Sequence, residues 1–154
     1  MVKRTACGFR FLISASTLAA GLTFAGVASA VELITDDEAR LPAAPKMGTR
    51  GGITRGPGIK VVSPNPDAQI KAPFAMKVDF QPHGGSKIDA SSVKVTYLKK
   101  PAVDLTPRLK SGISESGISL ADASVPAGTH DIKIDVTDAD GRTKTEIVSF
   151  TVVK

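Results

Sequence analysis

The stretch VPAGTHDIKIDVTDADGRTKTEIVSFTVVK, residues 125–154, decides the fold. In residues 131–137, isoleucine and valine alternate with aspartate, lysine and threonine, a period of two that is typical of a half-buried strand. The segment 138–141, Asp-Ala-Asp-Gly, has turn chemistry, because aspartate forms local hydrogen bonds and glycine tolerates a positive φ. A second alternating run then places Val148, Phe150 and Val152 on one face. This stretch therefore predicts a β-hairpin.

The same period of two recurs earlier in the chain. The clearest run is 74–81, where Phe74, Met76, Val78 and Phe80 alternate with Ala75, Lys77, Asp79 and Gln81. Shorter strands are predicted at 59–63, at 93–97, around Val103 and Leu105, and within 113–120. No window has a convincing helical period, and prolines and glycines separate the runs. About seven short strands at roughly 8–12-residue spacing predict an all-β fold, a single antiparallel β-sandwich over residues 59–154.

The first thirty residues have the features of an export signal. Lys3, Arg4 and Arg10 form a basic start, and residues 11–27 are apolar or small. The following Ala-Ser-Ala at 28–30 is a small-x-small cleavage site. We therefore predict a secretory signal peptide over residues 1–30. A membrane anchor is disfavoured, because the run is short and rich in Gly and Ser, whereas a span needs ~20 apolar residues.

Cleavage after Ala30 changes the composition. It removes the only cysteine, Cys7, so the mature chain forms no disulfide and must rely on its core. It also removes three cations and no acid, which lowers the net charge from +5 to +2. The high isoelectric point is therefore partly a property of the signal, and it does not predict nucleic-acid binding, which needs a clustered basic face. The expected location is the periplasm or the outside of the cell, with no transmembrane span after cleavage.

Residues 31–58 lack a sustained period. Their first part is acidic, their second part is basic, and eight prolines and glycines interrupt them: Pro42, Pro45, Gly48, Gly51, Gly52, Gly56, Pro57 and Gly58. We predict a flexible charged linker here, with one helical turn near 36–41. Either the charges only solvate this linker, or the segment docks on a partner or an acidic envelope surface.

The C-terminal residues resemble bacterial immunoglobulin-like domains. Such domains often end in a Pro-Gly turn, an alternating strand, an Asp-x-x-Gly turn and a strand that closes in Phe-Thr-Val. The matching residues are 126–128, 132–136, 138–141 and 150–152. The likeness is good over these thirty residues and only architectural from Ile59 onward. Many of these domains have a tyrosine at the position of His130, and its hydroxyl forms the hydrogen bond of the tyrosine corner. That hydrogen bond is lost here unless the histidine replaces it. The family serves adhesion, spacing and ligand binding, so the resemblance implies a scaffold and no particular activity.

Two sets of residues are candidate metal ligands, although we predict no metal site. Asp138 and Asp140 followed by glycine could begin a calcium loop, with Asp135 as an extra ligand, but no third carboxylate follows at the required spacing. His83 and His130 are the only histidines, and with Met76 they suggest a similarity to periplasmic copper-resistance sandwich proteins. No two of these soft ligands have short ligand spacing.

Three further functions are disfavoured by the sequence. Residues 112–116 nearly match Gly-x-Ser-x-Gly, but the last residue is Ser and the helix of a nucleophile elbow is missing, so we predict no enzyme. Sugar and single-strand nucleic-acid binding need exposed aromatic platforms. The mature aromatics are Phe74, Phe80, Tyr97 and Phe150, and all are predicted to face inward.

The segment 99–120 is a candidate partner-binding edge. It combines weak strand signals with an unusual number of apolar residues, namely Val103, Leu105, Leu109, Ile113, Ile118 and Leu120. Either these side chains complete the core, or some remain outside and form a contact surface for a partner's strand.

The sequence thus predicts an exported, non-catalytic module of the bacterial envelope that binds or spaces an unidentified protein partner. The alternative is a periplasmic protein that binds a small ligand or a metal, copper or calcium. No cofactor is expected, and the pattern does not specify an oligomeric state.

Overall fold

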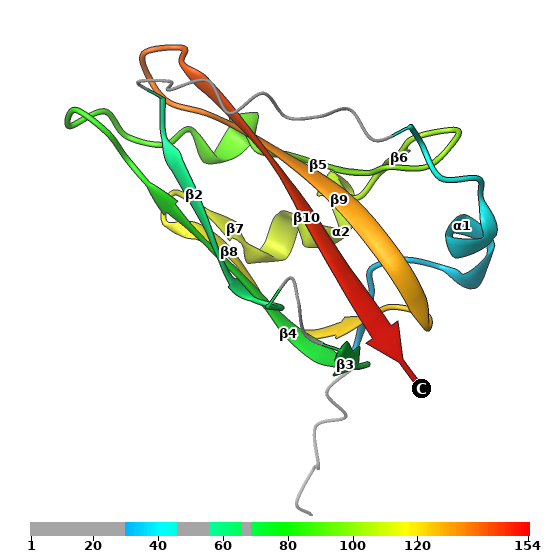
Figure 1. Cartoon of the computed structure of the whole chain (residues 1–154). Helices are drawn as coiled ribbons and strands as arrows, with labels where there is room; N and C mark the ends of the chain where they lie inside the picture. The colour runs from blue at the N-terminus through cyan, green and yellow to red at the C-terminus, as the bar shows by residue number, and fades with distance from the viewer. Residues whose placement is uncertain (1–29, 46–55, 66–68) are drawn as a thin grey trace, which may run out of the picture.

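Two β-sheets face each other (Figure 1), and buried apolar side chains form the core. The computed structural model describes residues 30–45, 56–65 and 69–154. The first sheet contains β1 (Val31–Glu32), β2 (Gly58–Ser63), β4 (Phe74–Gln81), β7 (Ile113–Ser114) and β8 (Gly117–Ser124). The second contains β3 (Gln69–Lys71), β5 (Lys94–Tyr97), β6 (Val103–Asp104), β9 (Gly128–Thr137) and β10 (Thr143–Val153). We call them the β4 sheet, with the order β1-β8-β4-β2 and β7 beside β8, and the β9 sheet, with the order β3-β10-β9-β5-β6. The predicted all-β sandwich is confirmed.

The predicted C-terminal hairpin is the longest ladder of the fold. β9 and β10 pair from Thr137 opposite Thr143 to Gly128 opposite Val152. Every second residue of β9 is buried, because the pleat turns alternate side chains toward the other sheet. Ile132, Ile134 and Val136 of β9, with Val148, Phe150 and Val152 of β10, face Met76, Val78 and Phe80 of β4 across the core. Burial of such side chains stabilises the fold by about 1.5–3 kcal/mol each.

The described residues form more strands than the seven predicted, because several of the ten are only two or three residues long. Two of these short strands also depart from the predicted antiparallel pairing, since β1 runs parallel to β8 and β3 runs parallel to β10. The helical elements are equally short: α1 (Asp36–Arg40), α2 (Thr106–Leu109), and the 3₁₀ turns η1 (Ala90–Ser92) and η2 (Lys110–Gly112). None of the helices in the described segments is long and apolar enough to cross a membrane.

The N-terminal residues 31–45, assigned above to the linker, are part of the sandwich. We call them the N-terminal strap. Val31 lies opposite Ala123 of β8, and Leu33 and Ile34 are buried in the core. The strap then crosses to the β9 sheet, where Ala43 forms a bridge with Lys99. The predicted boundary at residue 59 therefore misses residues 31–45, whose two buried apolar side chains, Leu33 and Ile34, were too few to give a period. Of the other linker residues, 46–55 lie outside the described part of the chain, and Gly58 is the first residue of β2.

The segment 103–120 connects the two sheets. It leaves β6 through α2 and η2 and enters β7 and β8 (Figure 1). Two glycines of this segment, Gly112 and Gly117, mark close backbone approaches. A Cβ atom on Gly112 would collide with the carbonyl of Ser119, and one on Gly117 would collide with the carbonyl of Val78. Gly117 also has a φ of 152°, a conformation that favours glycine.

Candidate functional site

The carboxylate of Asp138 organises the turn between β9 and β10. Its Oδ1 accepts hydrogen bonds from the backbone N–H groups of Asp140, at 3.0 Å, and Arg142, at 2.8 Å. The N–H of Gly141, which has a φ of 78°, donates to the carbonyl of Asp138 at 2.9 Å. The side chain is fully buried, and the Arg142 guanidinium lies 3.7 Å from its Oδ2. These backbone N–H groups therefore occupy the space around Oδ1 that a coordinated cation would need.

The other two aspartates of the proposed calcium set have different partners. Asp135 lies on the outward face of β9, where it accepts a hydrogen bond from Thr145 at 2.6 Å and pairs with Lys133 at 2.8 Å. Asp140 pairs with Arg142 at 3.2 Å. Within the described ranges, no three His, Cys, Asp or Glu side chains gather as a metal site would require. The structure does not bring the candidate calcium ligands together.

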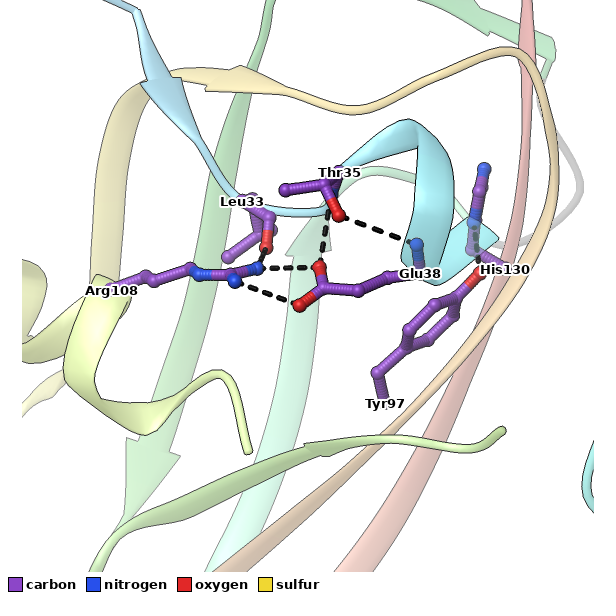
Figure 2. Close-up of polar contacts among 6 residues, drawn as sticks. All are labelled: Leu33, Thr35, Glu38, Tyr97, Arg108 and His130. Atoms are coloured by element: carbon purple, nitrogen blue, oxygen red, sulfur yellow. Dashed lines mark hydrogen bonds and ion pairs between the residues drawn. The ribbon is translucent and has the colours of Figure 1, made fainter. Parts of the chain in front are cut away.

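His130 is a buried structural residue at the start of β9. Its Nε2 lies 2.9 Å from the carbonyl of Pro126, and its Nδ1 lies 2.8 Å from the hydroxyl of Tyr97 (Figure 2). Because a carbonyl oxygen can only accept a hydrogen bond, Nε2 carries the hydrogen of the neutral ring. Nδ1 therefore accepts a hydrogen bond from the hydroxyl of Tyr97. The rings of Tyr97 and Phe150 both lie 5.7 Å from the imidazole ring, measured between centroids. Both ring nitrogens are thus occupied by protein groups.

Burial shifts the acid–base behaviour of this pair toward the neutral forms. Burial lowers the pKa of His130 below its usual 6.5, and the charge of Lys99 adds to that effect. Burial also raises the pKa of Tyr97 to about 12, helped by the charges of Asp131 and Glu38. The pair is therefore an uncharged link inside the core at neutral pH.

The second histidine lies at the opposite end of the sandwich. His83 is exposed on the loop after β4, and the adjacent Gly84 lies close to Arg142 of the β9–β10 turn. His130 lies at the other end of β9, roughly 26 Å from that turn at about 3.3 Å per residue. Met76 is buried in the core. The structure does not bring the candidate copper ligands together either.

Most of the apolar residues proposed as a partner-binding edge belong to the core. Leu105, Leu109 and Ile118 are at most 1 % exposed, and Leu120 is also buried. A partner cannot reach these side chains in the folded protein, so the proposed edge is corrected at these positions. Val103 and Ile113 are only partly buried, and they pack against the core from its margin. Leu105 and Leu109 turn inward at the two ends of α2, and Ile118 and Leu120 face the core through the pleat of β8.

The strand edges offer little room for an added partner strand. β6 and β7 have two residues each, and β3 has three. The longest outer strand, β2, is interrupted where Val61 and Ser63 pair with consecutive residues of β4, which leaves Val62 as a bulge. Short and bulged edges prevent sheet-to-sheet pairing between proteins. Pairing along 99–120 is therefore disfavoured as the binding mode.

An ion pair joins the strap to α2. The guanidinium of Arg108 binds both carboxylate oxygens of Glu38, at 2.7 and 2.8 Å, and also donates to the carbonyl of Leu33 at 2.9 Å (Figure 2). Thr35 and Glu38 form a capping box at the start of α1. Hydrogen bonds from Arg108 lower the pKa of Glu38 to about 2. The Thr-x-x-Glu signature was readable in the sequence, but its partner seventy residues away was not.

A concavity of the described surface lies against α2. It has a volume of about 590 Å³, and we call it the α2 hollow. Its lining residues come from η1, β6, α2, η2 and β7: Ala90, Ser91, Val93, Asp104, Thr106, Pro107, Lys110 and Ile113. No local sequence pattern predicts this hollow, because five separate elements build it. Of the apolar residues proposed as a partner-binding edge, Ile113 lines the hollow, and the same segment also contributes Asp104, Thr106, Pro107 and Lys110.

The polar groups of the α2 hollow differ in their availability. The hydroxyl of Thr106 accepts a hydrogen bond from the N–H of Val95 at 2.9 Å, and the backbone N–H of Thr106 binds Asp104 at 2.9 Å. Hydrogen bonds from the side chain and the backbone N–H of Thr106 lower the pKa of Asp104. The positive charge of Lys94 lowers it further. Ser91 donates its hydroxyl to Asp89 at 2.6 Å. These three polar residues of the rim are engaged within the protein.

Comparisons with known proteins identify no family for this chain. No family model matches it, and no curated protein is similar to it. Among solved structures, the chain is similar to CopC from Methylosinus trichosporium OB3b, with a TM-score of 0.39 and 16 % sequence identity. The match covers 62 % of this chain and 93 % of that one. The fold described above rests on its own strands and core.

Proposed function

We propose that the chain is an exported, non-catalytic, immunoglobulin-like module of the bacterial envelope that binds a protein partner. The order of its strands supports the immunoglobulin-like assignment. Lettered along the chain, β2, β4, β8 and β7 give the sheet A-B-E-D, and β5, β9 and β10 give the sheet C-F-G, the arrangement of a constant-type immunoglobulin domain. The short strands β3 and β6 extend the second sheet, and β1 is an addition.

The histidine at the start of strand F agrees with this assignment. In immunoglobulin folds, a tyrosine near this position bonds to the backbone a few residues upstream. Here His130 Nε2 donates to the carbonyl of Pro126, four residues upstream, at 2.9 Å. His130 therefore takes the structural role of the corner tyrosine, and the same bond removes it as a candidate for chemistry.

The α2 hollow is the observation that carries a binding function. Its volume of about 590 Å³ lies within the roughly 300–1,000 Å³ of ligand sites, and its lining includes the apolar residues Ala90, Val93, Pro107 and Ile113. The titratable side chains described above serve structural bonds, so the geometry supports binding better than catalysis. A binding module needs only a rigid surface of suitable shape, which the two sheets supply.

Capture of partners from the native envelope tests this function. The tagged protein is recovered from envelope extracts beside two variants with the same substitution, Ser91→Trp in the hollow and Ser119→Trp on the exposed face of β8. We expect the indole at Ser91 to fill the hollow and abolish capture of a partner that the Ser119→Trp protein retains. If both variants capture the same proteins as the wild type, or if nothing is captured by any of them, the proposed function is wrong.

A further inference from the structure

We infer that protonation of His130 detaches the second half of the strap, residues 39–45, from the β9 sheet and leaves the first half, residues 31–38, in place. This conformational device goes beyond the proposed function and does not depend on it. It follows from a series of contacts that connects His130 to the second half of the strap. The first half is held by a separate attachment through Glu38.

Two side chains connect His130 to the second half of the strap. The hydroxyl of Tyr97 donates to Nδ1 of His130 at 2.8 Å (Figure 2). The ammonium group of Lys99 lies 5.4 Å from the centroid of the Tyr97 ring, and it donates to the carbonyl of Ala39 in α1 at 2.9 Å. Lys99 also forms a bridge with Ala43. The position of Lys99 therefore determines how this half of the strap lies on the β9 sheet.

Protonation of His130 disturbs these contacts at two points. Nδ1 then carries a hydrogen and no longer accepts from the hydroxyl of Tyr97, which is fully buried and cannot bond to solvent instead. The new positive charge also repels the ammonium group of Lys99. Burial, and after it the charge of Lys99, lowers the pKa of His130, so the two cations already interact across the Tyr97 ring.

The other groups around His130 do not compensate for this charge. Phe150 of β10 contributes an uncharged ring, and the carbonyl of Pro126 accepts from Nε2 whether or not the imidazole is charged. Asp131, the next residue of β9, attracts a charged imidazole, but its effect is smaller than that of Lys99. Lys99 is only partly buried, so it is the group that can move away from the new charge.

The first half of the strap has attachments that mild acid leaves intact. Arg108 binds both carboxylate oxygens of Glu38 and also donates to the carbonyl of Leu33 at 2.9 Å. The pKa of Glu38 is about 2, so its carboxylate stays charged in mildly acidic solution. The N–H of Leu33 also donates to the carbonyl of Ser124 at 2.9 Å. Only the half that Lys99 holds is therefore sensitive to the charge on His130.

Hydrogen exchange of the purified, isotope-labelled protein tests the inference. The backbone N–H groups of Ala44 and Lys100 donate across the contact between the strap and the residues after β5, at 3.2 and 2.9 Å. We expect their exchange rates, corrected for the intrinsic effect of pH, to rise below pH 6.5, because the detached form binds the proton more readily. The rise should reach up to about tenfold for each unit of pH. The N–H of Leu33 and the amides of residues 132–136 should show no such rise.

Two pairs of variants assign the rise to this set of contacts. His130→Gln is uncharged at every pH and should abolish the rise, whereas His83→Gln, at the exposed histidine, should keep it. Lys99→Met retains a long side chain but loses the ammonium group. It should increase the exchange of Ala44 already at pH 7.5 and abolish the further rise in acid, whereas Lys100→Met, at the exposed neighbour, should behave as the wild type.

Three results would overturn the inference. The first is a constant exchange rate of Ala44 between pH 7.5 and 4.5 in the wild type. The second is a rise of equal size at Ala44, Leu33 and residues 132–136, because that would reflect unfolding of the whole domain. The third is a rise that persists in either His130→Gln or Lys99→Met. If His130→Gln does not fold, Lys99→Met decides alone, since its substitution lies at the margin of the domain.

Discussion

Glu38 makes the contacts that attach the strap to the sandwich. Its carboxylate receives two hydrogen bonds from Arg108, and charge-assisted bonds of this kind contribute about 1.5–3 kcal/mol. We expect Glu38→Gln to lower the free energy of unfolding by about that amount at pH 7. The matched change Asp37→Asn, on an exposed residue of the same helix, should have little effect. Chemical denaturation of the three proteins provides the measurement.

The pH dependence of the Glu38 contribution has a defined sign. Its folded-state pKa of about 2 lies below the ordinary value of 4.5, so the folded protein favours the charged form. The contribution is complete above the ordinary value and is lost as the pH falls from about 4.5 toward 2. The gap between wild type and Glu38→Gln should therefore close at pH 2. If the difference in unfolding free energy between the two proteins persisted at pH 2, the contribution of Glu38 would come from packing and not from its charge.

His130 gives a second acid-sensitive contribution at higher pH. Because burial lowers its pKa below 6.5, the unfolded chain takes up the proton first. Stability is therefore complete above pH 6.5 and falls as the solution is acidified below it. Protonation would place a hydrogen on Nδ1, which now accepts from Tyr97, so that bond must rearrange.

Two histidine variants separate this contribution from all others. His130→Phe should lose about 1–3 kcal/mol at pH 7.5, because the Pro126 carbonyl and the Tyr97 hydroxyl lose their partner. It should also lack the decline in stability just below pH 6.5, which His83→Gln should keep. Melting temperatures measured at half-unit steps of pH would reveal both effects. If His83→Gln abolished the decline instead, the buried histidine would not be its source.

At the scale of elements, the strap contributes core side chains to a sandwich of long strands. Leu33 is fully buried, and we expect Leu33→Ala to destabilise the protein by about 2–5 kcal/mol. Val62→Ala removes a comparable apolar side chain from the exposed bulge of β2, and it should change stability by less than about 0.5 kcal/mol. Equal small losses in both variants would mean that the strap is dispensable.

The sequence predicts elements well where side chains alternate over many residues. β4, β9 and β10 have eight, ten and eleven residues, and their pattern of burial follows directly from the period of two. The two-residue strands β1, β6 and β7 are too short to have a period, so only their neighbours define them. For the same reason the start of the domain was misplaced, since Leu33 and Ile34 look like isolated apolar residues in a charged stretch.

Candidate sites are harder to predict than strands because they depend on distances across the chain. The turn around Asp138 follows from its local sequence, and its alternative, a calcium loop, was already weakened by the missing third carboxylate. The pairing of His130 with Tyr97 and of Glu38 with Arg108 spans 33 and 70 residues, which no local pattern encodes. The α2 hollow depends on five elements at once, so only the folded arrangement reveals it.

At the scale of the whole molecule, the strap should behave as part of the domain even when its covalent connection is cut. The sequence predicts protease sites at Arg50 and Arg55, which lie between the strap and β2 and outside the described residues. Contacts on both sides hold the strap, since β1 pairs with β8 and the backbone N–H of Lys100 donates to the carbonyl of Pro42 at 2.9 Å.

After limited cleavage with trypsin, we expect both pieces to elute together in gel filtration and to separate only in denaturant. Arg108→Ala removes the bonds to Glu38 and Leu33, so in the cleaved protein it should release the N-terminal piece more readily than Lys77→Ala does. A cleaved wild-type protein that loses its N-terminal piece while the remainder keeps its melting temperature would restore the sandwich boundary to residue 59.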